Sequence, residues 1–357
     1  MTTAGFPGIH LPGSMPFSNG TQMFAFVGER LKQWVKRVPD ETGARTGWVG
    51  TQRAAFETDA FETSPPEQVG PLPPLPRKQL RSDVDPETFE FEPFQYERAV
   101  APSYDQFRAA RDAGLLRPDA RLLVTMPTPH NVVSGFVATA DQAPVRAAYE
   151  RALARAVEHM AAVVPHDELA IQWDLVGELA ILNGVYAVPY WDAGTIGDSL
   201  ARCAAIVPPD VQLGYHLCYG DSNNAFLIRA SGPGERHFAR PPIPDASALL
   251  ASARAVTAAV QRPIAFVHMA CPYQWTEVAA WRPLGELELA PSTELFLGLV
   301  HAQDGVSGAR LRAALAETVI GPRAFGIATE CGMGRYQDDA KFNAAIDALT
   351  TLARERQ

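Results

Sequence analysis

The chain has few cysteines: four among 357 residues, at Cys203, Cys218, Cys271 and Cys331. So low a density excludes a small disulfide-stapled scaffold, and the chain is long enough to bury a large core without one. The first residues contain no basic region followed by an apolar run, so we expect that the chain has no signal peptide. We therefore expect a cytoplasmic protein whose thiols are reduced. Metal binding or chemistry is the favoured use of the thiols, with core packing the alternative for Cys203 and Cys271.

Long apolar runs and blocks of like charge are also missing. No stretch of 18 apolar residues exists, so no helix is expected to span a membrane. The net charge is −9, and the sequence contains no run of basic residues. We therefore expect no binding of nucleic acid or of an anionic membrane through a basic surface. The rest of the composition, 47% hydrophobic and 20% charged, is ordinary for a globular protein. We therefore expect small-molecule partners, and a homo-oligomer is the basic expectation for such a protein.

Short apolar runs recur along the chain, and helical patterns separate most of them. Each run is continuous, which is typical of parallel strands buried on both faces. The eight runs are 8–14, 34–40, 121–127, 169–175, 211–218, 263–270, 295–301 and 324–331. Helical spacing is clearest at 145–163, 246–260, 308–319 and 340–354. This alternation predicts an α/β fold, a (β/α)8 TIM barrel that takes up residues 1–357 as a single domain.

Two stretches interrupt the alternation. Residues 50–104 are rich in Pro, Glu and Phe and are too long for a simple loop, so we interpret them as an insertion after the second predicted strand. This insertion is expected to lie over or beside the mouth of the barrel, as a lid, a packed surface segment or a partner contact. A shorter excursion is expected at 219–244.

A histidine and two cysteines at the ends of predicted strands suggest a metal site. His216 and Cys218 are two residues apart at the end of one run, so both side chains leave the same face of the strand. Cys331 ends another run, within the Gly-rich sequence "TECGMGR". One imidazole and two thiolates are suited to a catalytic zinc, which keeps an open fourth position. The alternative is a packed cysteine beside an incidental histidine.

The sequences "GYHLCYGD", "IQWDLVGEL" and "ATECGMGR" resemble the catalytic barrel of cobalamin-independent methionine synthase. The similarity is greatest to the shorter single-barrel relatives of that family, in the superfamily that also contains uroporphyrinogen decarboxylase. The resemblance implies that His216, Cys218 and Cys331 hold zinc. It also implies that the zinc binds a thiol and holds it as a thiolate, which attacks a methyl group carried by a folate.

The same resemblance implies which residues meet the substrate. Ser14 matches the family's Gly-Ser motif, and Glu41 and Asp174 match the two carboxylates that bind the substrate ammonium. Gln172 and His130 also stand at strand ends, and we expect both to bind substrate.

Three more residues complete the expected site. His301 matches a catalytic histidine that assists proton delivery, and Asp304 is near enough in sequence to orient it. His268 stands where the family has a zinc-binding glutamate. It is expected to be the fourth metal ligand, or else a substrate or acid–base residue.

The sequence departs from the family in ways that bear on the alkyl donor. It has one barrel where the longer synthases have two, and "TPHNVVSGF" lacks the family's folate-region tryptophan. No corrinoid-binding motif is present, so a corrinoid would arrive on another protein. The favoured function is a zinc-dependent transferase that moves a methyl or other alkyl group onto a small, amino-acid-like thiol.

Two other functions stay open. A lyase or hydrolase on the same barrel would use zinc-bound water as its nucleophile, and the altered residue at His268 motivates this alternative. A zinc-containing binding protein without catalytic activity is the second.

Overall fold

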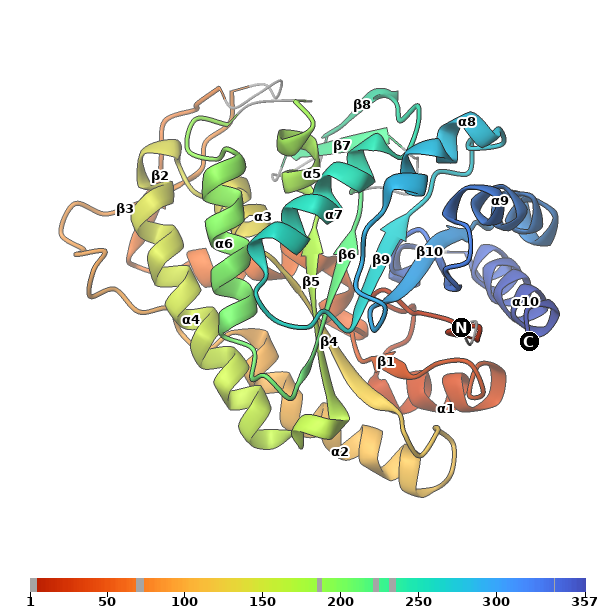
Figure 1. The fold of residues 1–357 in the computed structure, drawn as a ribbon. Helices are drawn as coiled ribbons and strands as arrows, with labels where there is room; N and C mark the ends of the chain where they lie inside the picture. The colour runs from red at the N-terminus through yellow and green to blue at the C-terminus, as the bar shows by residue number, and fades with distance from the viewer. Residues whose placement is uncertain (1–4, 69–73, 185–187, 221–224, 231–235, 337) are drawn as a thin grey trace.

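The computed structural model describes residues 5–68, 74–184, 188–220, 225–230, 236–336 and 338–357. Its centre is a curled sheet of seven strands in the order β1-β4-β5-β6-β9-β10-β11 (Figure 1). All neighbouring pairs in this sheet are parallel. The strands are β1 (Arg37–Pro39), β4 (Arg121–Pro127), β5 (Leu169–Leu175), β6 (Gln212–Leu217), β9 (Phe266–Ala270), β10 (Glu294–Val300) and β11 (Phe325–Thr329).

The sheet confirms the predicted α/β architecture. Strands β4 and β5 coincide with the predicted runs 121–127 and 169–175, and all seven residues of β5 are buried. Continuous burial follows from parallel pairing, because helices cover the outer face while side chains fill the inner one. Four of the other strands of the sheet are shorter than predicted, and β10 is displaced by one residue.

The first predicted strand, residues 8–14, forms only isolated bridges. Ile9 lies in a parallel bridge with Val35 at one edge of the sheet and with Ile327 at the other. Its N–H donates to the carbonyl of Trp34, and the N–H of His10 donates to that of Ile327. Pro12 has no N–H to continue the ladder, so the pairing stays short. The segment nevertheless contacts both edges of the curled sheet.

Helices surround the sheet, with α4, α6 and α7 on one side and α9 and α10 on another (Figure 1). Asn19, Asp192 and Asp338 cap the first turns of three helices through their side chains. Among the described residues, no helix is long and apolar enough to cross a membrane. The helices are α1 (Gly20–Arg30), α2 (Gln95–Asp112), α3 (Pro129–Phe136), α4 (Gln142–Val163), α5 (Gly177–Leu182), α6 (Ala193–Ala205), α7 (Ser247–Ala259), α8 (Val278–Trp281), α9 (Gly305–Ile320) and α10 (Asp339–Glu355).

The predicted insertion is not uniform in structure. It begins inside the irregular 3-10 segment η1 (Gly43–Phe56) and continues into the antiparallel pair β2 (Phe61–Thr63) and β3 (Lys78–Leu80). Helix α2 begins at Gln95, so residues 95–104 belong to a helix beside the sheet and were wrongly included. Aromatic side chains attach the segment to α4: the ring of Phe56 contacts those of Phe61, Phe91 and Tyr149.

The second excursion contains an antiparallel hairpin, β7 (Ala225–Ala230) and β8 (Arg236–Pro242). It follows β6 and lies at the top of Figure 1, where the strands of the main sheet end. Residues 221–224 and 231–235 of this predicted excursion lie outside the described residues.

Large side chains fill the inside of the sheet near the beginnings of the strands. The guanidinium of Arg37 lies over the ring of Phe266 at 4.3 Å from its centroid and pairs with Glu294 over 2.8 Å. Gly214 makes room for this ring, because a Cβ there would lie 2.1 Å from a Phe266 atom. The polar side chains of the candidate site therefore lie toward the opposite, carboxyl ends of the strands.

Candidate metal centre

The three predicted metal ligands come together. His216 is near the end of β6, Cys218 follows that strand, and Cys331 follows β11. One ligand atom from each residue lies within 4.8 Å of the other two. The spacing of His216 and Cys218 puts both on one face, and the curl of the sheet brings the end of β11 to the same point.

This donor set fits a zinc ion. An imidazole nitrogen and two thiol sulfurs are the ligands that zinc prefers, and three protein ligands are typical of a catalytic site. Tetrahedral zinc with Zn–S bonds of about 2.3 Å separates two sulfurs by roughly 3.8 Å. The two sulfurs therefore need to approach each other by no more than about 1 Å from the 4.8 Å limit. His216 and Cys218 are buried and Cys331 is partly exposed, so the open side of the group faces the pocket described below.

His268 does not join the three ligands, contrary to the prediction of a fourth ligand. Its Nδ1 lies 2.6 Å from Nδ1 of His216, and its Nε2 lies 3.0 Å from the carbonyl oxygen of Thr329. Both ring nitrogens of His268 therefore have partners other than a metal, namely His216 and Thr329. Burial, helped by the neighbouring His216 and His10, holds the pKa of His268 well below its usual value, so the ring is neutral.

A pocket opens onto the metal ligands. Ser14, Glu41, Trp48 and Asp174 contribute to its lining, together with all three ligands. Among the residues whose side chains the structure describes, two carboxyl groups and no lysine or arginine line it, which suits a ligand with a cationic end. Ser14 also packs against the loop after Cys331, because the N–H of Gly334 donates to its carbonyl over 2.8 Å.

The two carboxyl groups of the pocket are electrostatically strained. Burial, followed by the charge of Asp174, raises the pKa of Glu41 to about 8. Burial also raises the pKa of Asp174 to about 7, against hydrogen bonds from Gln172 and Trp48. Thr125 donates to Glu41 over 2.9 Å, and the indole N–H of Trp48 donates to Asp174 over 3.0 Å. A bound ammonium group would relieve this strain by favouring the ionised carboxylates.

Gln172 and His130 do not line this pocket, although both were expected to bind substrate. The amide of Gln172 donates to Asp174 and to the carbonyl of Pro12, and its oxygen accepts from His10. Gln172 thus supports Asp174 from behind. His130 is buried in α3, where its ring packs edge-to-face against Trp191.

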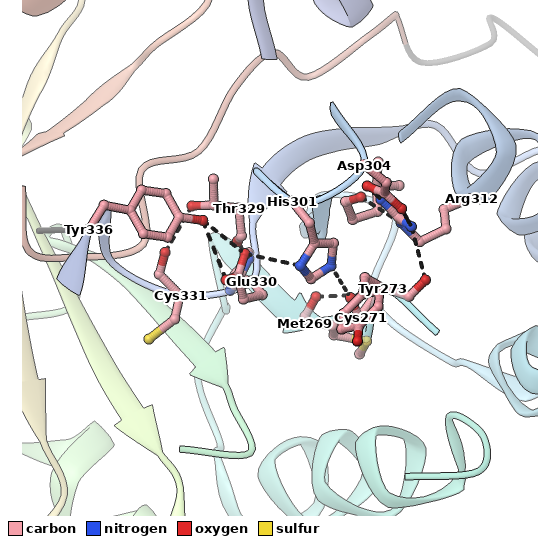
Figure 2. A network of polar contacts seen from close by, with 12 residues as sticks. Met269, Cys271, Tyr273, His301, Asp304, Arg312, Thr329, Glu330, Cys331 and Tyr336 are labelled. Carbon is pink, nitrogen blue, oxygen red and sulfur yellow. Dashed lines mark hydrogen bonds and ion pairs between the residues drawn. The ribbon is translucent and has the colours of Figure 1, made fainter. Parts of the chain in front are cut away.

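His301 lies between two partners in Figure 2. Its Nε2 lies 2.7 Å from the carbonyl oxygen of Cys271, and its Nδ1 lies 3.3 Å from Oε2 of Glu330. Because a carbonyl only accepts, Nε2 carries a hydrogen, and the nitrogen facing Glu330 holds the lone pair of a neutral ring. Burial and the Arg312 charge lower the pKa of His301 to about 4, so the ring is neutral at pH 7.

Asp304 does not orient His301, contrary to the prediction. Both of its carboxylate oxygens accept from the guanidinium of Arg312, at 2.6 and 2.8 Å. Arg312 is fully buried and also donates to the carbonyl of Leu299, so this pair anchors the start of α9 (Figure 2). Glu330 takes the position beside His301 that was predicted for Asp304.

The sequence did not reveal the contacts that Glu330 and Trp48 make in this site. Glu330 immediately precedes Cys331, and that adjacency was the available signal for a shared site. For Trp48 the sequence suggests only an apolar wall of the site, whereas in the structure its indole N–H reaches Asp174 from η1.

Solved structures share this fold. One is a B12-independent methionine synthase from Shewanella sp. W3-18-1 in complex with selenomethionine, with a TM-score of 0.59 and 12% identity over 99% of this chain and 98% of that one. The fold is that of B12-independent methionine synthases. A protein from Listeria monocytogenes assigned as a vitamin-B12-independent methionine synthase matches with a TM-score of 0.55 and 11% identity, over 94% of this chain and 86% of the other. No family model and no curated protein matched the sequence.

Proposed function

We propose that this protein is a zinc-dependent transferase that moves a methyl or other alkyl group onto the sulfur of a small, amino-acid-like thiol. The observation that carries the proposal is the convergence of His216, Cys218 and Cys331 within 4.8 Å, at a pocket with two carboxyl groups. When bound there, zinc would supply Lewis acidity that lowers the pKa of a thiol and makes the thiolate available at neutral pH.

We also infer that residues 8–14 take the eighth strand position of a (β/α)8 barrel. Two bridges support this inference. Ile9 pairs with Val35, just before edge strand β1, and with Ile327 in edge strand β11. In such a barrel the carboxyl ends of the strands face one mouth, where the metal ligands and the pocket carboxyl groups lie. The chain would then act as a single domain.

In the proposed reaction the protein's own residues bind and orient the thiol. Glu41 and Asp174 hold its ammonium group, and Trp48 and Gln172 keep the carboxylate of Asp174 in place. Ser14 contributes to the pocket wall beside them. His301, held by the carbonyl of Cys271 and facing Glu330, is suited to holding or moving one proton.

The fold comparison supports the substrate class. The Shewanella protein is in complex with selenomethionine, an amino acid with an alkylated selenium in place of sulfur. The family that the sequence resembles is zinc-dependent, which agrees with the donor set here. The alkyl donor is a folate, an epoxide or a corrinoid carried by another protein, and the test therefore covers all three.

The first experiment is metal analysis of the protein purified without chelators. We expect about one zinc per chain, lost in Cys218→Ser. Cys203→Ser is the matched control, because Cys203 is a buried cysteine in α6 outside the ligand group and its loss should leave the zinc content unchanged. The zinc-loaded protein is then assayed with amino-acid thiols and each donor class. A well-folded wild type without zinc contradicts the proposal.

A hydrolytic or lyase reaction is the second candidate. The observation that favours it is the position of His268 outside the ligand group, which leaves three protein ligands, as many hydrolytic zinc sites have. Turnover without any added thiol would support this candidate, whereas strict dependence on a thiol would support alkyl transfer.

A further inference from the structure

We propose that His268 is a positioning residue: it fixes the tautomer and orientation of His216 and connects His216 to the strand that carries Cys331. This inference rests on the metal site of the proposed function. His268 therefore contributes to metal binding through His216, in place of the direct ligation that its sequence position suggested.

The strand register places His268 for this role. His216 in β6 and His268 in β9 are paired residues of adjacent parallel strands, so their side chains leave the sheet on the same side. Both rings are buried, and their centroids are 4.7 Å apart. The contact between the two Nδ1 atoms, at 2.6 Å, requires one proton between them.

A glycine opens the path from His268 to β11. Gly298 lies in β10, between β9 and β11, and a Cβ at this position would lie 2.7 Å from both Nε2 of His268 and the carbonyl oxygen of Thr329. Without that Cβ, His268 reaches across β10 to Thr329 over 3.0 Å. A glycine inside a strand commonly marks such a close approach.

The carbonyl of Thr329 decides the direction of the hydrogen bonds. A carbonyl only accepts, so Nε2 of His268 carries a hydrogen, and Nδ1 of the neutral ring holds a lone pair. His216 must then donate from its own Nδ1, which puts the lone pair of His216 on Nε2. A metal-binding histidine needs this arrangement, in which one nitrogen donates to a fixed acceptor and the other ligates.

The same contacts reach Cys331. The side-chain hydroxyl of Thr329 donates to the carbonyl of Cys331 over 2.8 Å, while its backbone carbonyl accepts from His268. His216 on β6 and Cys331 after β11 are thus held by one continuous set of hydrogen bonds through His268 and Thr329. The loss of His268 should loosen both ligands.

Cobalt binding tests this role without relying on activity. Co²⁺ is titrated into wild type, His268→Leu and His268→Asn, with absorption bands of the cobalt–thiolate bonds and affinity against a competing chelator as readouts. His268→Leu should bind cobalt roughly 10- to 100-fold more weakly and with altered bands. Asparagine has an oxygen near the position of Nδ1, so His268→Asn should recover most of the affinity. His130→Leu, which removes a buried histidine packed against Trp191, should bind as wild type does.

The outcomes separate two failures. If wild type binds no cobalt, the metal site of the proposed function fails and this inference fails with it. If wild type binds cobalt and His268→Leu has the same affinity and spectrum, or His268→Asn is as weak as His268→Leu, only the role of His268 is refuted.

A measurement on wild type covers the case in which the variants do not fold. The ¹⁵N chemical shifts of labelled histidines in the metal-free protein report which ring nitrogen carries hydrogen. We expect hydrogen on Nδ1 of His216 and on Nε2 of His268. The opposite assignment for His216 would overturn the inference.

Discussion

The indole N–H of Trp48 donates to Oδ2 of Asp174 over 3.0 Å, so an aromatic residue of η1 holds a carboxyl group at the end of β5. Trp48 has a φ of +48°, and it is the only non-glycine residue among the described ones with a positive φ. Such a backbone conformation is costly and is usually kept where function requires it. It places the indole at the wall of the pocket that contains the metal ligands.

Trp48→Phe should weaken the binding of thiols that carry an ammonium group. The variant keeps an aromatic wall but removes the donor that stabilises the ionised form of Asp174, whose pKa is already raised to about 7. We expect roughly ten-fold weaker binding at pH 7, or about 1.4 kcal/mol, and a smaller loss at pH 9, where Asp174 is ionised in both proteins. Calorimetric titration measures this, with a thiol that lacks the amine as control. An equal loss for both thiols would contradict the assignment.

Glu41→Gln should make the protein more stable, and increasingly so as the pH rises. Burial raises the pKa of Glu41 to about 8 from 4.5, so between these values the folded state keeps a proton that the unfolded state releases. Wild-type stability therefore falls as pH rises from about 4.5 to about 8, at about 1.4 kcal/mol per pH unit from this group. Glutamine removes that contribution and still accepts from Thr125. Urea unfolding of the metal-free proteins at pH 5, 6.5 and 8 measures the difference. Parallel curves would refute the raised pKa.

Asp304→Asn should cost stability and leave catalysis intact. The change leaves the fully buried Arg312 without its charged partner. Removing one partner of a fully buried ion pair lowers the free energy of unfolding by about 3–5 kcal/mol. Asp304 is about one-third exposed, so we expect a loss of about 2 kcal/mol in the free energy of unfolding. Chemical unfolding and steady-state kinetics on the same preparations measure the two effects. A large fall in kcat at unchanged stability would mean that Asp304 acts on His301 after all.

Glu330→Gln should show the opposite pattern. A glutamine amide can donate to Nδ1 of His301, so the fold and the ring orientation are kept, but no proton can be exchanged with the side chain. We expect kcat to fall at least about ten-fold, with thermal stability and zinc content close to wild type. Steady-state kinetics on both proteins provide the measurement. Unchanged kcat would remove the proton-transfer role from the His301–Glu330 pair.

The apolar runs predicted the bounds of β4 and β5 correctly. Most residues of β4 and all residues of β5 are buried, as expected for parallel strands that are covered on both faces. The segment at 8–14 has the same apolar character, but its pairing depends on backbone donors, and Pro12 lacks one. Apolar patterning reports burial and does not report hydrogen bonding.

The candidate site was predictable in its residues and less so in their contacts. His216 and Cys218 could be paired from their spacing, because two residues along a strand return to the same face. The role of His268 depends on its register against His216 and on the missing side chain of Gly298, and neither is visible without the sheet. Asp304 is nearest in sequence to His301, yet the buried charge of Arg312, two turns along α9, is its stronger partner.

The position of Ile9 has a consequence for how the chain folds. Its backbone neighbours are Val35, which is close in sequence, and Ile327, which is roughly three hundred residues away. During synthesis the residues around Ile9 therefore cannot pair with β11 until β11 has been made. The two edges of the sheet are joined only after nearly the whole chain has been synthesised. Contacts of such long range make folding slow. A chain truncated before β11 would leave the edge of β10 open to other strands, so incomplete chains should aggregate.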